Sequence, residues 1–210
     1  MAESAARFRE RIARRQAAKF AEHRSELADA AIETLSERGH ARTSLREIAQ
    51  NSAFSHGVLH YYFADKADLI TFCVRRDKTQ CVRRYDEIMA AAATPEELIR
   101  GYMAALTETL RTDGAMHRLW YDIRGQSMFE DQFRADVDDI DKSLENMTWR
   151  IMTRYAALSG RRLVPSPGAV YAAFDGMFRH GLIRQLAGST AAVDDLVADA
   201  GRLMPRLVTD

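Results

Sequence analysis

Helical hydrophobic periodicity runs through almost the whole chain and constrains its fold more than any other feature. Glycine and proline are rare, with 11 and 4 among 210 residues, so few segments carry residues that interrupt helices. No stretch alternates apolar and polar residues in the way that a half-buried strand requires. The sequence therefore predicts an all-α protein of about nine helices, in which a three-helix module precedes a larger helical bundle.

Capping residues predict where individual helices begin and end. The first helix is expected from about Ser4 to Arg38, because Gly39 then follows as a normal terminating glycine. Glu47 lies three residues after Ser44, as in a capping box. The residues expected to cap the later helices are Thr43 or Ser44, Ser55, Asp65 and Thr94.

These elements divide the chain into three expected parts. Residues 1–20 form a basic extension of the first helix, residues 21–66 form the compact module, and residues 67–210 form the bundle. The last three long helices of the bundle are expected at 131–159, 168–186 and 191–208.

Charge, cysteine content and hydropathy exclude several classes of protein. Thirty basic and thirty acidic residues cancel, so the chain as a whole is not a polycation. Residues 1–24 nevertheless hold seven basic and three acidic residues, a local excess of four positive charges. No apolar run reaches the roughly 18 residues of a membrane span, and no secretory signal precedes the helices. Two cysteines without a disulfide framework suit a reducing cytoplasm.

One uncharged stretch, SAFSHGVLHYYF (residues 52–63), stands out in a chain of which 29% is charged. Together with the short helix expected before it, it makes a helix-turn-helix unit. At about 100° of rotation per residue, Leu59, Tyr62 and Phe63 share the inward side of the second helix. Gly57 and Tyr61 then point outward.

The outward side of this second helix has the chemistry of a surface that reads DNA. Hydroxyl and imidazole groups, flanked by the small residue Gly57, suit close approach to phosphates and base edges in a groove. Carboxylates are absent from the stretch, as a polyanionic partner requires. Longer-range attraction is expected from Lys66, Arg42, Arg46 and the arginines of the amino-terminal extension.

At these residues the chain resembles a known family. The segment TSLREIAQNSAFSHGVLHYYFADKADLI, within residues 24–70, is similar to the amino-terminal domain of the tetracycline-repressor (TetR) family of bacterial transcriptional regulators. The resemblance implies phosphate contacts at Thr43 and Lys66. It implies recognition-helix contacts at Ser55, His56, Gly57, His60, Tyr61 and Tyr62, and Ser44 and Arg46 complete the expected DNA-contacting set.

Two residues depart from the family pattern. Ala53 occupies the turn where the family usually has glycine, which would cost about 1 kcal/mol if the backbone there were left-handed. His60 stands where tyrosine is usual. A zinc site is an alternative for His56 and His60, four residues apart, but Gly57 replaces the glutamate of a metalloprotease and no third ligand is near in sequence.

The carboxy-terminal half is more loosely similar to the betaine-type repressors of the family, through MHRLWYDIRG and YAAFDGMFRHGLIRQLAG. The resemblance implies that the bundle, residues 67–210, binds a small-molecule inducer and dimerises. The expected pocket residues are Met103, His117, Trp120, Tyr121, Phe129, Trp149, Met152, Phe174, Asp175 and Phe178, although ordinary core packing is an alternative for each.

Broad apolar faces on the last two helices predict half of a four-helix dimer interface. Small residues near them permit close helix approach. The expected interface residues are Val170, Phe174, Met177, Phe178, Gly181, Leu182, Leu196 and Leu203.

These observations predict a homodimeric, ligand-responsive regulator that binds a near-palindromic operator and is released by an unknown inducer. The resemblance implies that the regulator is a repressor. Pairs of dimers on one operator are a further expectation. No phosphate loop, nucleophile–base pair or metal cluster is recognisable, so the prediction is no enzyme, no cofactor, no metal and no membrane partner. The resemblance places the protein in the bacterial cytoplasm with the nucleoid. The alternatives are a DNA-binding architectural protein and a regulator without a small-molecule effector.

Overall fold

The computed structural model describes residues 2–38 and 43–210, which form two compact units, residues 1–74 and 75–210. Gly39, expected to end the first helix, and Arg42 lie outside the described residues. Nine α-helices account for most of the described chain, which confirms the all-α prediction. None of the described helices combines the length and the hydropathy of a membrane span.

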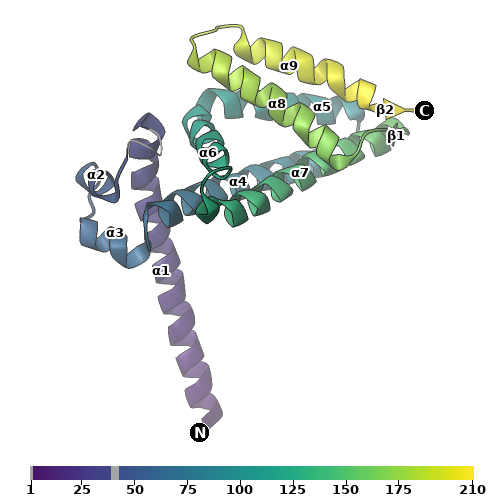
Figure 1. Ribbon diagram of the computed structural model, residues 1–210. Coiled ribbons are helices and arrows are strands. Elements are labelled where there is room, and N and C mark those ends of the chain that lie inside the picture. The colour runs from purple at the N-terminus through teal and green to yellow at the C-terminus, as the bar shows by residue number, and fades with distance from the viewer. Residues whose placement is uncertain (1, 39–42) are drawn as a thin grey trace. The chain divides into compact units, whose positions relative to one another are not determined.

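The first unit contains α1 (Ala2–Arg38), α2 (Leu45–Gln50), α3 (His56–Tyr62) and the beginning of α4 (Lys66–Ala91) (Figure 1). Its core joins Leu27 and Leu35 of α1 to Ile48 of α2 and Leu59 of α3, all fully buried. The amino-terminal part of α1 projects away from α2 and α3, and its described side chains before residue 23 are exposed.

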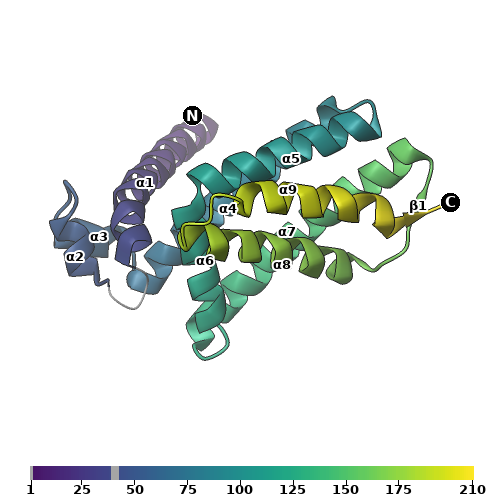
Figure 2. The same ribbon diagram turned by 90° about the horizontal axis from the view of Figure 1, so that it is seen from above.

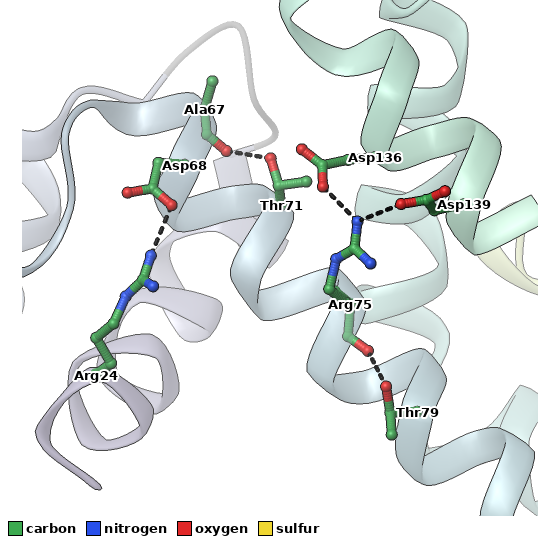
Figure 3. A network of polar contacts seen from close by, with 8 residues as sticks. All are labelled: Arg24, Ala67, Asp68, Thr71, Arg75, Thr79, Asp136 and Asp139. Atoms are coloured by element: carbon green, nitrogen blue, oxygen red, sulfur yellow. Dashed lines mark hydrogen bonds and ion pairs between the residues drawn. The ribbon is translucent and has the colours of Figure 1, made fainter. Parts of the chain in front are cut away.

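The start of α4 belongs to the first unit because it packs against α1. The Arg24 guanidinium lies 2.6 Å from the Asp68 carboxylate (Figure 3) and also stacks on the rings of Phe63 and Phe72. The thiol of Cys73 approaches the Ala28 carbonyl oxygen at 3.7 Å. The unit therefore ends at Val74, eight residues beyond the boundary expected from the sequence.

The turn between α2 and α3 holds Ala53 without strain. No residue other than glycine has a positive φ in the described parts of the chain, so Ala53 is not left-handed. Ser52 organises this turn instead: its Oγ donates to the Ala49 carbonyl oxygen and accepts from the Phe54 amide, both at 3.2 Å. A serine side chain that bonds to nearby backbone stabilises a turn without glycine.

The second unit is a helical bundle that begins within α4. It continues with α5 (Pro95–Thr112), α6 (Gly114–Gln126), α7 (Asp131–Ser159), α8 (Pro167–Leu186) and α9 (Ala192–Leu203). The helices α8 and α9 lie side by side in both views (Figures 1 and 2). Within this unit, Arg75 of α4 forms ion pairs with Asp136 and Asp139 of α7 (Figure 3).

The carboxyl end departs from the prediction of one helix over residues 191–208. The helix α9 ends at Leu203, and a 3₁₀ turn, η1 (Met204–Leu207), follows it around Pro205. The last residues form β2 (Val208–Thr209), which pairs antiparallel with β1 (Arg162–Leu163). Proline cannot donate a helical hydrogen bond, and strands of two residues are too short to show alternation.

The capping residues act as the sequence predicts. Ser44 and Glu47 form a reciprocal capping box at the start of α2, and Thr94 and Glu97 form another at α5. Ser55 Oγ accepts from the Val58 amide at 3.3 Å, and Asp65 Oδ1 accepts from the Asp68 amide at 2.9 Å. These side chains satisfy helix N–H groups that would otherwise lack partners.

Replacement of Thr94 by alanine tests the α5 cap. The variant loses the acceptor for the Glu97 amide, which lies 3.2 Å from the threonine Oγ1. We expect the free energy of unfolding to fall by about 1 kcal/mol, measured by urea denaturation. Thr79→Ala is the matched control, since its exposed hydroxyl bonds within the interior of α4. An equal loss in both variants would contradict a capping role.

Candidate functional site

The exposed face of α3 carries the residues predicted to contact DNA. His56, Gly57 and His60 are exposed, and Tyr61 is 72% exposed. A Cβ atom built on Gly57 would meet nothing closer than the Ser55 hydroxyl at 4.0 Å. Packing within the chain therefore does not require glycine at this position, although glycine weakens a helix.

A shallow surface groove joins this face to the ends of the neighbouring helices. It measures about 650 Å³ and contains two carboxylates, Glu47 and Asp65, which the charge-free stretch of sequence did not include. Both carboxylates are occupied as helix caps: Glu47 accepts from the Ser44 amide at 2.8 Å, and Asp65 accepts from the Asp68 amide. The lining residues are Thr43, Ser44, Leu45, Arg46, Glu47, His56, His60, Asp65 and Lys66.

The predicted contacts outside α3 differ in accessibility. Ser44 and Arg46 are exposed on the first turn of α2, and Lys66 is half-buried at the start of α4. Thr43 is only 3% exposed, so its side chain offers little surface to a partner. The structure thus places Ser44, Arg46 and Lys66 along the groove, and Thr43 also lines it but has little exposed surface.

The Tyr62 side chain is partly exposed and does not belong to the buried core. Its ring packs on Phe20 and His23 of α1, with centroids 4.8 and 5.9 Å apart, and is half-buried. Tyr61 extends this aromatic cluster, 6.1 Å from Phe20 and 4.9 Å from Tyr62. Tyr62 therefore packs against the first helix, as helical rotation predicts, and keeps part of its ring exposed.

The basic extension of α1 presents its described cations to the outside. Arg11, Arg15 and Lys19 are exposed, and exposed Arg14 pairs with Glu10 at 2.6 Å. An ion pair this exposed contributes little to stability, so Arg14 keeps its charge available to a partner.

The two histidines of α3 lie edge to face, with ring centroids 4.4 Å apart. Within residues 2–38 and 43–210, no cluster of three histidine, cysteine or acidic side chains has the arrangement of a metal site.

The second unit contains a partly open cavity of about 70 Å³, lined by residues of α4, α5, α6, α7 and α8. Six of the ten predicted pocket residues line it: His117, Trp120, Tyr121, Phe174, Asp175 and Phe178. The sequence did not single out the remaining lining residues, which are Lys78, Cys81, Tyr85, Tyr102, Leu106, Thr109, Leu144, Met147, Thr148 and Tyr171.

The other four predicted pocket residues lie elsewhere. Phe129 is 81% exposed in the loop after α6, and Trp149 is half-buried on α7. Met103 and Met152 are buried in the core but do not line the cavity. Aromatic and methionine content alone does not separate cavity walls from core, since both are apolar.

A signal for the α4 wall is nevertheless present in the sequence. Val74, Lys78, Cys81 and Tyr85 repeat at the spacing of one helical face, and a lysine within such an apolar stripe is unusual. Lys78 is only 2% exposed. A buried lysine of this kind indicates a polar site inside the bundle.

The buried Lys78 ammonium is held between two groups. Its Nζ lies 3.0 Å from an Asp77 carboxylate oxygen and 3.1 Å from His117 Nδ1. Burial lowers the pKa of His117 well below its ordinary value, and the positive charges of Lys78 and Arg84 lower it further. His117 is therefore neutral near pH 7 and accepts a hydrogen bond from Lys78.

A polar network also borders the cavity through Tyr121, Tyr171 and Asp175. The Arg124 guanidinium lies 2.6 Å from Asp175 and 3.0 Å from Asp141. The Tyr121 hydroxyl donates to Asp175 at 2.9 Å, and the Tyr171 hydroxyl donates to Asp141. Burial, and the carboxylate beside each hydroxyl, raise the pKa of both tyrosines. Asp175, predicted as a ligand-orienting residue, is thus already paired with Arg124.

The predicted dimer residues mostly pack within the chain. Val170, Phe174, Phe178, Gly181, Leu182 and Leu196 are buried, and a Cβ on Gly181 would lie 3.5 Å from side chains of Leu110 and Leu196. The most apolar side of α8 therefore faces the bundle core, and the role of these residues in a dimer stays a prediction. Met177 and Leu203 are half-buried. The exposed side of α8 instead carries Ile183 and Leu186, 58% and 53% exposed.

The lowered pKa of His117 predicts a dependence of stability on pH. As the pH falls below about 6.5, the unfolded chain gains a proton on this residue that the folded chain does not bind. The resulting loss of unfolding free energy approaches about 1.4 kcal/mol per pH unit. We expect His117→Gln to remove this contribution, measured by urea denaturation between pH 7.5 and 5. His180→Gln, on the exposed side of α8, should keep the wild-type pH profile.

Comparison with known proteins places this arrangement in a family. Residues 27–71, which contain the helix-turn-helix, match the model described as bacterial regulatory proteins, tetR family. The HTH-type transcriptional regulator BetI of Paraburkholderia xenovorans is 32% identical over 114 residues, which cover 53% of this chain and 57% of the relative. The chain thus aligns with little more than half the length of that protein.

Solved structures of related regulators share the whole fold at low sequence identity. A transcriptional regulator from Saccharomonospora viridis, solved with choline, aligns with a TM-score of 0.72, 17% identity, and coverage of 90% of this chain and 99% of that one. The regulator FadR of Bacillus subtilis, solved with stearoyl-CoA, gives 0.70, 19% identity, and coverage of 88% and 97%. Residues 27–71 thus match the tetR family of bacterial regulatory proteins, and the helices of the described chain have the fold of these solved regulators.

Proposed function

We propose that the protein is a ligand-responsive repressor that binds a near-palindromic operator as a homodimer and leaves it when a small molecule occupies the bundle cavity. The observation that carries the proposal is the exposed face of α3. It presents hydroxyl and imidazole groups around a glycine that the fold itself does not need. Such a surface suits close approach to base edges and phosphates.

The distribution of charge on the first unit also supports DNA as the partner. The two carboxylates in the groove beside α3 are engaged as helix caps, whereas Arg46 and the cations of the α1 extension are exposed. Exposed cations attract a polyanion and lose this attraction as salt rises. Binding should therefore combine a salt-dependent contact with phosphates and a sequence-dependent contact from α3.

Selection of bound sequences from random duplex DNA tests the proposal directly. A dimer with two recognition helices predicts a near-palindromic motif whose half-sites are centred about 34–36 Å apart or somewhat more. Failure of the purified protein to bind any duplex at low salt would contradict the assignment of α3.

Substitutions on α3 separate binding from folding. Gly57→Ala should leave the fold intact or stabilise it by about 0.5–1 kcal/mol, since the added methyl group meets open space. It should weaken operator binding by about 1–3 kcal/mol because the methyl group lies between helix and groove. Tyr61→Ala should weaken binding by a similar amount.

The measurement is operator affinity by fluorescence anisotropy, with urea denaturation in parallel. Lys142→Ala, on the exposed side of α7, serves as a control that should leave both quantities unchanged. Wild-type operator affinity in both α3 variants would exclude α3 as the reading helix.

The cavity supports the ligand-responsive part of the proposal. It is enclosed by aromatic rings and has a few polar groups, as small-molecule sites commonly do. One helix, α4, carries both Lys66, an expected phosphate contact, and the cavity residues Lys78, Cys81 and Tyr85. An inducer acts only if it binds the released form more tightly than the operator-bound form.

A packed cavity with no ligand response would instead favour an architectural DNA-binding protein. A melting-temperature screen against small molecules distinguishes the two functions, since an architectural protein has no effector to bind.

Dimerisation is proposed through the outer side of α8 together with α9, rather than through the buried residues predicted from the sequence. Ile183 and Leu186 are exposed apolar side chains on one face of α8. Gly176 lies on the same side, and a Cβ there would meet nothing within 4 Å. An apolar face with a small residue allows two helices to approach closely across a two-fold axis.

Replacing Ile183 by glutamate should disrupt this interface. A carboxylate buried between protomers would lack a partner, so we expect a shift toward a single chain of 23.8 kDa in light-scattering chromatography. Val164→Glu is the matched control, since Val164 is 67% exposed outside α8 and α9. A dimer that persists in Ile183→Glu but not in Val164→Glu would place the interface elsewhere.

A further inference from the structure

We propose that the ligand of the bundle cavity is a small organic carboxylate with an apolar or aromatic body, bound through the Lys78 ammonium. This inference rests on the proposed ligand response and names the chemical class of the effector. It depends on four features of the cavity: its buried charge, its neutral acceptor, its walls and its size.

The first feature is the buried positive charge. Lys78 lines the cavity, is 2% exposed, and has an ammonium group with three N–H donors. Asp77 and His117 account for two of these donors. The third is available to an acceptor in the cavity, and a charged acceptor makes the stronger hydrogen bond.

The second feature is that the neighbouring groups leave one N–H donor of Lys78 without an acceptor, although Asp77 pairs with the ammonium at 3.0 Å. His117 is neutral, and Asp77 is the one carboxylate paired with Lys78. Arg84, which donates to the cavity residue Thr109 at 3.0 Å, adds a second cation nearby, although Asp113 lies 3.5 Å from it.

A second carboxylate, that of Asp175, lines the cavity. Asp175 accepts from Tyr121 and pairs with Arg124 at 2.6 Å, so its charge is already compensated. The cavity near Lys78 and His117 therefore favours an anion over a cation.

The third feature is the chemistry of the walls. Tyr102 and Phe174 pack edge to face with centroids 5.7 Å apart, and His117 stacks against Phe178 at 4.6 Å. Trp120 and Leu106 complete the apolar lining. Such walls bury an apolar body and leave its carboxylate directed at Lys78.

The fourth feature is size. A cavity of about 70 Å³ holds roughly five to seven water-sized groups, at about 10–15 Å³ for each. The volume therefore favours a short aliphatic or single-ring acid over a long acyl chain with its carrier.

These features argue against the ligands seen in two proteins of similar fold. Choline, present in the Saccharomonospora viridis structure, would bring a quaternary ammonium against the Lys78 ammonium. Aromatic rings attract such a cation, but a quaternary ammonium has no acceptor for the remaining N–H donor of Lys78 and carries a like charge. Stearoyl-CoA, present in the Bacillus subtilis structure, exceeds the cavity volume.

The test uses Trp120 as a reporter, because its indole lines the cavity and the chain has two tryptophans. In the full-length Trp149→Phe protein, Trp120 is the sole tryptophan. Its fluorescence is titrated with benzoate, phenylacetate and hexanoate, with the matching amides benzamide, phenylacetamide and hexanamide, and with choline. We expect saturable binding of at least one acid, at least about tenfold weaker binding of its amide, and no response to choline.

Variants of Lys78 identify the source of the preference. Lys78→Met in the same background should bring acid and amide to within about threefold of each other, and Lys78→Gln should do the same while keeping a donor. Lys142→Met removes an exposed lysine of α7 and should retain the wild-type preference. If neither Lys78 variant folds, the comparison of acid with amide in the Trp149→Phe protein decides whether the cavity prefers a carboxylate.

The proposal is overturned if no acid of the set binds, if acid and amide bind equally, if choline binds saturably, or if the preference survives loss of Lys78. Operator binding measured in parallel separates this result from the proposed function. Release of DNA by choline and not by any acid would keep a ligand-responsive regulator and reject the carboxylate. Absence of DNA binding would reject the regulator while the fluorescence titration still decides the ligand class.

Discussion

The bundle is organised around a buried ammonium group. The Lys78 side chain is buried away from water. A buried ammonium group is stable inside a protein only when charged or polar partners compensate for its lost solvation. Asp77 supplies the charge and His117 supplies a neutral acceptor, which burial and nearby cations keep unprotonated. Aromatic side chains from α5, α6 and α8 surround this group and leave a cavity beside it. An ammonium held in an apolar enclosure makes the cavity selective by charge, whereas aromatic walls alone would accept many ligands.

The two units of the chain use polar groups in opposite ways. In the first unit, carboxylates near α3 are engaged as helix caps, and the outer face of α3 keeps hydroxyl and imidazole groups exposed. In the second unit, Arg124 joins Asp141 and Asp175 in a network that also engages two tyrosine hydroxyls. Exposed polar groups can pair with an external partner, whereas the paired groups of the network hold α6, α7 and α8 together. The helix α4 contributes to both units, with Lys66 at its start and Lys78 three turns later.

Several features of the site were predictable because they depend on neighbours in sequence. The caps at Ser44, Ser55 and Thr94 need only a side chain and an amide three residues apart. The outward direction of Gly57 and Tyr61 follows from helical rotation alone. Helical rotation also predicts that Tyr62 packs against the first helix, but its neighbours there, Phe20 and His23, lie about forty residues earlier in the chain and could not be named from the local pattern. The strain expected at Ala53 does not arise, since Ser52 bonds to the backbone of the turn.

The sequence by itself determined the helical class, the helix-turn-helix and the resemblance of that module to a family, because periodicity, caps and motif spacing are local properties of a chain. Tertiary structure decided which apolar residues form core, cavity or outer surface. Phe174 and Phe178 of α8 line a cavity, Met152 fills the core and Phe129 is exposed, although all four are large and apolar. Their positions depend on which other helix each side chain contacts, and the local sequence pattern does not predict these contacts. The same reason explains why a lysine in an apolar stripe became interpretable only when His117, thirty-nine residues away, was found beside it.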